Sequence, residues 1–193
     1  MEPDQERSLI HRPSHELTTP PIGANRILGE MVENSLTLAK NSAREAEELN
    51  AFVREGKQIQ GSPGMTPENI RAFNLFFRAA TAGHAEAELE LGTCFTFGIG
   101  VECNCEEGFR WLRSAAHKRN INAQFMLGLC YSLGKGVPQD YRHSYIWFRL
   151  ASDRGLEAAT KALATLTSSL APSELEMAEY LYSSLKKNSS TKR

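Results

Sequence analysis

One stretch decides the fold of this chain: Leu127 to Tyr141, with the sequence LGLCYSLGKGVPQDY. Its apolar residues first follow the three- and four-residue spacing of one helical face. Gly134 and Gly136 come next, and glycine ends a helix cheaply because it adopts positive φ. Asp140 then offers a side chain that accepts from the free amides of a starting helix. The stretch therefore predicts the corner of a helix hairpin.

This corner occurs twice in the sequence. LGTCFTFGIGV, from Leu91 to Val101, aligns with LGLCYSLGKGV, from Leu127 to Val137, at an offset of 36 residues. The same offset relates further residues of the two units: Ala87 and Ala123, Gly92 and Gly128, Gly98 and Gly134, Gly100 and Gly136, Trp111 and Trp147, and Ala115 and Ala151. A degenerate unit precedes these two, with only its second half recognisable. Tandem units of this length are typical of a helical solenoid.

Each unit is predicted to contain two helices. In the later unit the first helix covers residues 123–133, and the second follows Asp140, carries Trp147 and ends at Gly155. Asn104 starts the second helix of the earlier unit in the same way. The predicted fold class is therefore all-α, an α/α solenoid of helix-hairpin repeats.

Gly92 and Gly128 lie inside the predicted first helices, where glycine costs about 1 kcal/mol relative to alanine. We expect close approach of the second helix to compensate, with large aromatic side chains packed against very small ones. The residues expected at this contact are Gly108, Ser144, Trp111 and Trp147.

The pattern resembles the Sel-1-like repeat family, relatives of tetratricopeptide repeats with a longer corner between the helices. The residues that carry the resemblance are Ala123, Leu127, Gly128, Tyr131, Gly134, Gly136, Val137, Asp140, Trp147, Ala151 and Gly155. It covers roughly residues 61–185, because the ending LTSSLAPSELEMAEYLYSSL resembles the capping helix that often follows the last unit. The resemblance implies a right-handed superhelix and roles such as adaptor in signalling or in the assembly of protein complexes.

Four segments are predicted along the chain. Residues 1–22 are polar and contain several prolines, so we expect them to be disordered. Residues 23–60 show helical periodicity and are predicted to form an N-terminal helical cap, as one long or two shorter helices. Residues 61–185 form the repeat array with its C-terminal capping helix, and residues 186–193 are a disordered tail.

Composition narrows the class of partner. The chain has 193 residues, a hydrophobic content of 41% and a net charge of −1. A net charge this small does not favour a nucleic-acid backbone or an anionic membrane surface as the binding partner. No stretch approaches the roughly 20 apolar residues of a membrane-spanning helix. The first residues carry charges where a signal peptide needs an apolar core. We expect no nucleic-acid partner, no membrane association and a cytoplasmic location.

The four cysteines are too few for a disulfide framework in a chain of this length. Cys94 and Cys130 share one slot in consecutive first helices, so we expect them to be buried. Cys103 and Cys105 lie where a helix starts, which favours a redox-sensitive thiol over a zinc site that would need two more ligands. We expect no metal and no cofactor.

No catalytic group of residues is evident. The histidines are scattered, and the glycine corners lack the strand and the Lys-Ser/Thr pair of a phosphate loop. A cysteine-rich secreted branch of the resembled family carries disulfides at positions that here hold Ala116 and Gln124. The resemblance therefore implies that this chain lacks the disulfides of that branch.

A binding surface is expected on the concave face, which the first helices line in helix-pair arrays. The candidate residues there, called the concave-face set below, are Glu86, Glu90, Thr93, Phe97, Asn122, Phe125, Leu129 and Leu133. Phe97 and Leu133 are equivalent and apolar, which is unusual for that slot in the family, and they would form a contact patch. The alternative is that they pack against a neighbouring corner or the N-terminal cap.

The sequence thus favours a non-catalytic scaffold or adaptor that binds another protein or a peptide segment. One alternative is a small hydrolase of the cysteine-rich type. The other is a self-associating protein that buries the patch on a second copy of itself.

Overall fold

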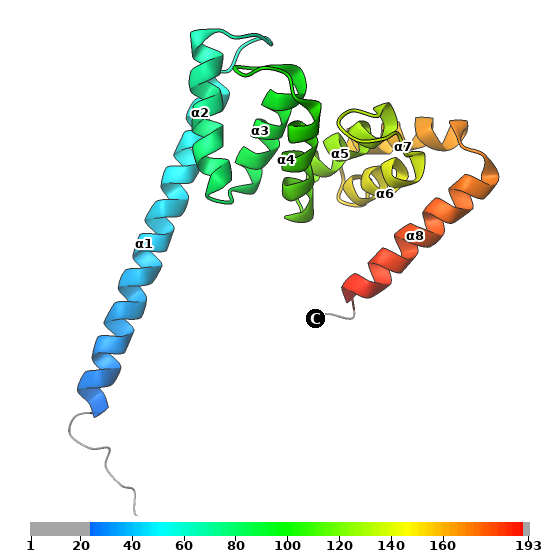
Figure 1. The fold of residues 1–193 in the computed structure, drawn as a ribbon. Coiled ribbons are helices and arrows are strands. Elements are labelled where there is room, and N and C mark those ends of the chain that lie inside the picture. The colour runs from blue at the N-terminus through cyan, green and yellow to red at the C-terminus, as the bar shows by residue number, and fades with distance from the viewer. Residues whose placement is uncertain (1–23, 191–193) are drawn as a thin grey trace, which may run out of the picture. The chain divides into compact units, whose positions relative to one another are not determined.

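The structure, a computed structural model, describes residues 24–190 and shows an all-α solenoid of helix hairpins (Figure 1). Its helices are α1 (Ala24–Ile59), α2 (Pro67–Thr81), α3 (Ala85–Phe97), α4 (Cys105–His117), α5 (Ile121–Leu133), α6 (Tyr141–Ser152), α7 (Glu157–Ser169) and α8 (Pro172–Ser190). Within this described range, β structure is limited to an isolated bridge between Gly64 and Ile99. The predicted fold class is confirmed.

The chain divides into two compact units, residues 1–44 and residues 45–193. Of the first unit the structure describes residues 24–44, which form the first part of α1. The second unit holds the rest of α1 and helices α2 to α8. The segment predicted as a helical cap is one helix, and α8 runs five residues into the predicted C-terminal tail. The predicted disorder of residues 1–22 and 191–193 lies outside the described residues.

Polar side chains start the second helices of the hairpins, and glycines end the first helices, at the residues predicted from the sequence. Thr66, Asn104 and Asp140 accept from the amide three residues further on, at 3.2, 3.1 and 3.1 Å, and start α2, α4 and α6. Gly98 and Gly134 end α3 and α5 with φ of 68° and 69°. This left-handed conformation favours glycine, so the corner begins at the predicted residue in both units.

The second glycine of each corner joins neighbouring repeats. Gly100 and Gly136 also have left-handed φ, of 69° and 71°. A Cβ at Gly100 would overlap the carbonyl of Asn69, and one at Gly136 would overlap the carbonyl of Cys105. Each corner therefore rests on the backbone of the preceding repeat, at a distance that only glycine permits.

The glycines inside α3 and α5 lie at close helix crossings, but not against the expected tryptophans. A Cβ at Gly128 would lie 2.5 Å from the Phe148 ring, and one at Gly92 would lie 2.8 Å from Leu112 Cγ. The small residues opposite are as predicted, and Ser144 Oγ donates to the Gly128 carbonyl at 2.9 Å. The same contact recurs in the degenerate first unit, where a Cβ at Gly56 would overlap a phenylalanine ring of α2.

The tryptophans have a different role, so their predicted position over the glycines is wrong. Trp111 is half-buried and packs against the core formed by α1, α2 and α3. Trp147 is half-buried and packs against the core formed by α3, α4 and α5. The Trp147 ring lies 5.6 Å from the His117 ring of the preceding repeat. The residue that follows each tryptophan, Leu112 or Phe148, points into its own hairpin because neighbouring side chains on a helix lie about 100° apart.

We predict that Gly128→Val lowers the thermal midpoint of the array, because the new side chain must displace the Phe148 ring. Overpacking of this kind costs about 1–3 kcal/mol, which corresponds to a loss on the order of 5 °C. The measurement is thermal unfolding followed by far-UV circular dichroism.

The control is Gly61→Val, because a Cβ there would meet its nearest neighbour at an ordinary 3.7 Å. An equal midpoint for Gly128→Val and the wild type would show that the crossing of α5 and α6 is not tightly packed at this residue.

Candidate interaction site

The two glutamates of the concave-face set already have partners within the protein. Lys57 of α1 lies 2.5 Å from Glu86 Oε1 and 3.1 Å from Glu90 Oε1. Asn120 donates to the other oxygen of Glu86 at 2.7 Å. Burial raises the pKa of Glu86, but the hydrogen bonds from Lys57 and Asn120 outweigh it and lower the pKa overall. These carboxylates join α1, α3 and α5 rather than offering charge to a partner.

The middle of the set packs inward. Phe125 and Leu129 are half-buried against the core formed by α6, α7 and α8, and the Phe125 and Phe148 rings are 5.6 Å apart. Thr93 is half-buried and donates its hydroxyl to the Leu89 carbonyl at 2.9 Å. Of the other residues of the set, Asn122 is exposed.

Two apolar residues of the set remain open to solvent. Phe97 is 44% exposed and Leu133 is 62% exposed, at the last positions of α3 and α5. Lys135 lies over the Phe97 ring, with its Nζ 5.2 Å from the ring centre. We call these three residues the Phe97–Leu133 patch. Phe97 and Leu133 are the apolar members of the concave-face set whose exposure suits a protein partner.

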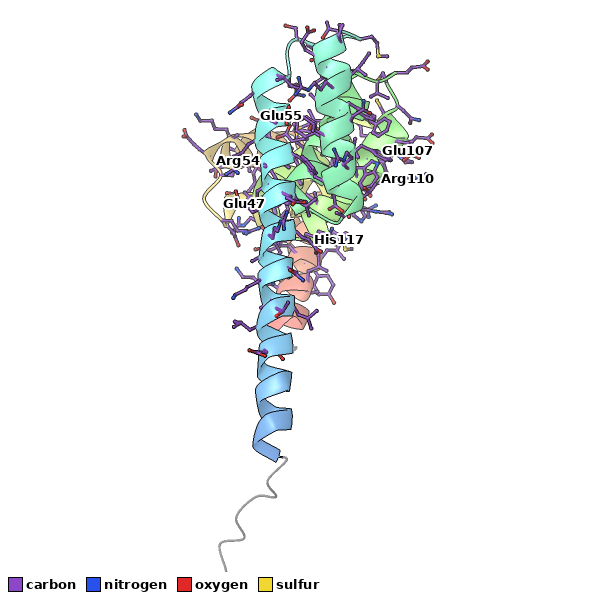
Figure 2. The ribbon with its side chains drawn as sticks, turned by 90° about the vertical axis from the view of Figure 1, so that its left-hand side faces the viewer. Glu47, Arg54, Glu55, Glu107, Arg110 and His117 are labelled. Carbon is purple, nitrogen blue, oxygen red and sulfur yellow. The ribbon has the colours of Figure 1, made fainter. Side chains whose placement is uncertain are left out.

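A larger hollow lies between α6 and α8, where the sequence predicted no site. This α6–α8 groove has a volume of about 910 Å³. Its lining residues come from α4, α5, α6, α8 and the loops beside them: Ala116, His117, Arg119, Gln124, His143, Ile146, Trp147, Leu150, Asp153, Arg154, Leu181, Tyr182, Ser184, Leu185 and Lys186. His117, at the C-terminal end of α4, is labelled in Figure 2.

Helix α8 forms one wall of the groove because it packs against α6 rather than pairing with α7. Ala178 is fully buried at this crossing. The hydroxyl of Tyr145 donates to Glu179 at 3.3 Å, and that of Tyr182 donates to Asp153. The hydrogen bond from Tyr182 is the main reason why the pKa of Asp153 is lowered. The groove is thus held between a repeat and its capping helix.

The cysteines divide into two buried and two accessible thiols. Cys94 and Cys130 are buried as expected, and burial raises the pKa of Cys94 to about 12 and that of Cys130 to about 11. Cys103 and Cys105 lie at the start of α4 with their Sγ atoms 3.9 Å apart. All four are free thiols. Among the side chains that the structure describes, those of residues 33 and 35–186, no group of three or more His, Cys, Asp and Glu is arranged to hold a metal ion.

We predict that iodoacetamide at about pH 8 alkylates Cys103 first, then Cys105, and leaves Cys94 and Cys130 unmodified while the protein is folded. The thiolate is the reactive species, and burial of the last two both blocks access and raises the thiol pKa. For Cys105, burial and the hydrogen bond with Cys103 raise the pKa as well. Peptide mass spectrometry measures the order.

Denatured protein is the control, since all four thiols then react. Early modification of Cys94 in the folded protein would contradict its position in the core between α2 and α3.

The family model of the Sel1 repeat matches residues 59–84, 85–120 and 121–156, just over half of the chain. The first match is short and covers mainly the second helix of the degenerate unit. The boundaries of the second and third matches, 85–120 and 121–156, agree with the 36-residue units of the sequence.

Two of the solved structures that are similar to this chain illustrate the match. One is a protective antigen of uropathogenic Escherichia coli with an SLR fold: it is 28% identical, has a TM-score of 0.66, and the match covers 74% of this chain and 30% of the antigen. The other is a Sel1 repeat protein from Oxalobacter formigenes: it is 28% identical, has a TM-score of 0.57, and the match covers 76% of this chain and 61% of that protein. The chain therefore spans only part of each.

The search of curated proteins found no match. Across the helices that the structure describes, none has the length and apolar character needed to cross a membrane.

Proposed function

Because the chain belongs to the Sel1 repeat family, we propose that it is a non-catalytic scaffold that presents a preformed helical surface to a protein or peptide partner. We include a cytoplasmic location in the proposal, since four free thiols suit a reducing compartment.

Rigidity of the array supports this function. Helix caps, close glycine crossings and corners seated on the preceding backbone fix each hairpin against the next. A surface that is already ordered loses little conformational entropy when a partner binds. The array therefore needs no large rearrangement to act as a docking platform.

The observation that carries the proposal is the Phe97–Leu133 patch. Two large apolar side chains, 44% and 62% exposed, stand in equivalent slots of consecutive repeats. A partner segment that follows the array would meet both, and Lys135 beside Phe97 would attract an acidic group next to its apolar contacts.

The test is affinity purification from the native cell, with co-eluting proteins identified by mass spectrometry. We predict that the double variant Phe97→Ser and Leu133→Ser loses partners that the wild type retains, because both apolar contacts are removed. The control is Phe77→Ser with Tyr180→Ser, whose native side chains are similarly exposed at 45% and 69% but lie on α2 and α8.

An identical set of co-eluting proteins for the wild type and the Phe97 and Leu133 variant would contradict the patch. Light scattering at several concentrations tests the alternative that the chain self-associates through the same surface. A dimer that the Phe97 and Leu133 variant abolishes would mean that the patch binds a second copy of the chain.

A further inference from the structure

The α6–α8 groove contains a buried acceptor that the protein itself does not satisfy. Gln124 is 5% exposed and lines the groove. Its Nε2 donates to the Ala116 carbonyl at 3.3 Å, whereas its Oε1 is buried and makes no hydrogen bond. An unsatisfied buried acceptor costs stability, and such groups are rare enough to need an explanation.

The preceding repeat shows how donors reach one oxygen of this slot, although the other oxygen there, Glu88 Oε2, is also buried without a hydrogen bond. Glu88 holds the position 36 residues before Gln124, and its Oε1 accepts from Ser114 at 3.0 Å and from Lys118 at 2.7 Å. One unit later these two donors are replaced by Leu150 and an arginine. The leucine cannot donate, and the arginine makes a different contact. The acceptor at the earlier position therefore has two side-chain donors to one of its oxygens, whereas the acceptor of Gln124 has none.

That arginine, Arg154, contributes uncompensated positive charge. It donates to the Arg119 carbonyl, as Lys118 donates to the equivalent Gly83 carbonyl one repeat earlier. Lys118 also pairs with a carboxylate, whereas the ion pairs found within residues 33–186 include neither Arg154 nor Arg119. Arg119 and Arg154 thus both line the groove without an ion pair, and the acidic residue of the lining, Asp153, is already paired with Arg149 and Lys186.

Arg119 occupies a position that its backbone does not favour. Its φ is 66°, and the equivalent residues of the neighbouring repeats are Gly83 and Gly155, with φ of 86° and 89°. Glycine takes this conformation at little cost, but a side chain there is strained. The backbone thus gives no reason for arginine at this position, whereas a charge at the mouth of the groove does.

The rest of the groove is mainly apolar. Ile146, Trp147 and Leu150 of α6 face Leu181 and Leu185 of α8 across it. Leu185 is 51% exposed, so α8 leaves this surface partly open. The volume of about 910 Å³ lies at the upper end of ligand pockets, which span about 300–1,000 Å³.

We propose that the α6–α8 groove binds an acidic peptide segment of a partner protein. A leucine or phenylalanine of the segment packs between α6 and α8, a backbone N–H donates to Gln124 Oε1, and carboxylates pair with Arg119 and Arg154. The inference takes from the proposed function only that the partner is a protein. Its site is separate from the Phe97–Leu133 patch, so either proposal can fail alone.

The test is selection of a random peptide library displayed on phage against the full chain. We expect enriched peptides to place Asp or Glu beside Leu or Phe. An enriched peptide, synthesised with blocked termini, is then titrated by calorimetry against the wild type and variants, at low and high salt. Its affinity should fall with salt because ion pairs at the groove mouth are screened.

Two variants remove the recognition groups without harming the fold. Arg119→Gly restores the glycine of the other repeats, so its thermal midpoint should equal or exceed that of the wild type, while peptide affinity falls about tenfold. Gln124→Met removes the acceptor at similar volume and should also weaken binding about tenfold. The Ala116 carbonyl keeps the Arg119 amide at 3.0 Å as a partner in that variant.

The control for lost charge is Arg110→Gln, since Arg110 pairs with Glu107 at 2.7 Å and is not among the groove-lining residues. This variant should bind like the wild type. The proposal is overturned if no peptide is enriched, if the enriched peptides lack acidic residues, or if both groove variants bind them unchanged. Peptides that lose affinity only with Phe97→Ser and Leu133→Ser would support the proposed function and reject the groove.

Discussion

A hydrogen atom in place of a side chain determines how closely the two helices of each hairpin approach. Gly128 lies under the Phe148 ring, and the equivalent pairs of the other two repeats have the same arrangement. The conformational cost of glycine inside a helix is offset by the buried contact of a large apolar side chain with backbone. The corners and caps hold their positions because this crossing fixes the angle and distance between the helices.

The end of the array differs from the earlier repeats in the helix that follows α7. Helix α7 packs on α6 as α5 packs on α4, but α8 packs on α6 instead of pairing with α7. Tyrosine hydrogen bonds to Asp153 and Glu179 anchor α8 there. A crossing helix cannot reproduce the side-chain interactions of a full repeat. The groove and its unsatisfied amide therefore arise where the repetition stops, which is also where a partner would find surface that the array does not use.

Sequence periodicity predicted the helix hairpins, their caps and their corner glycines, because these depend on residues close together in the chain. It placed Trp147 rather than Phe148 over Gly128, since both are large and neighbours in one helix, and spacing alone does not tell which one faces inward. It also missed that Lys57 of α1 neutralises Glu86, because that lysine lies outside the recognisable units. The groove could not be predicted, because it depends on where α8 packs, and repeat spacing does not give that position. The one signal in the sequence was Arg119, which stands where the neighbouring repeats have glycine.

The contact of each corner glycine with the backbone of the preceding repeat limits how the chain can change in length. Gly100 rests on the Asn69 carbonyl, and Gly136 rests on the Cys105 carbonyl, which occupies the equivalent position one unit later. Excision of residues 85–120 would bring Gly136 onto Asn69 with the same backbone geometry. Gain or loss of whole 36-residue units preserves these contacts, whereas an insertion between Asn69 and Gly100 or between Cys105 and Gly136 changes the spacing on which one of them depends.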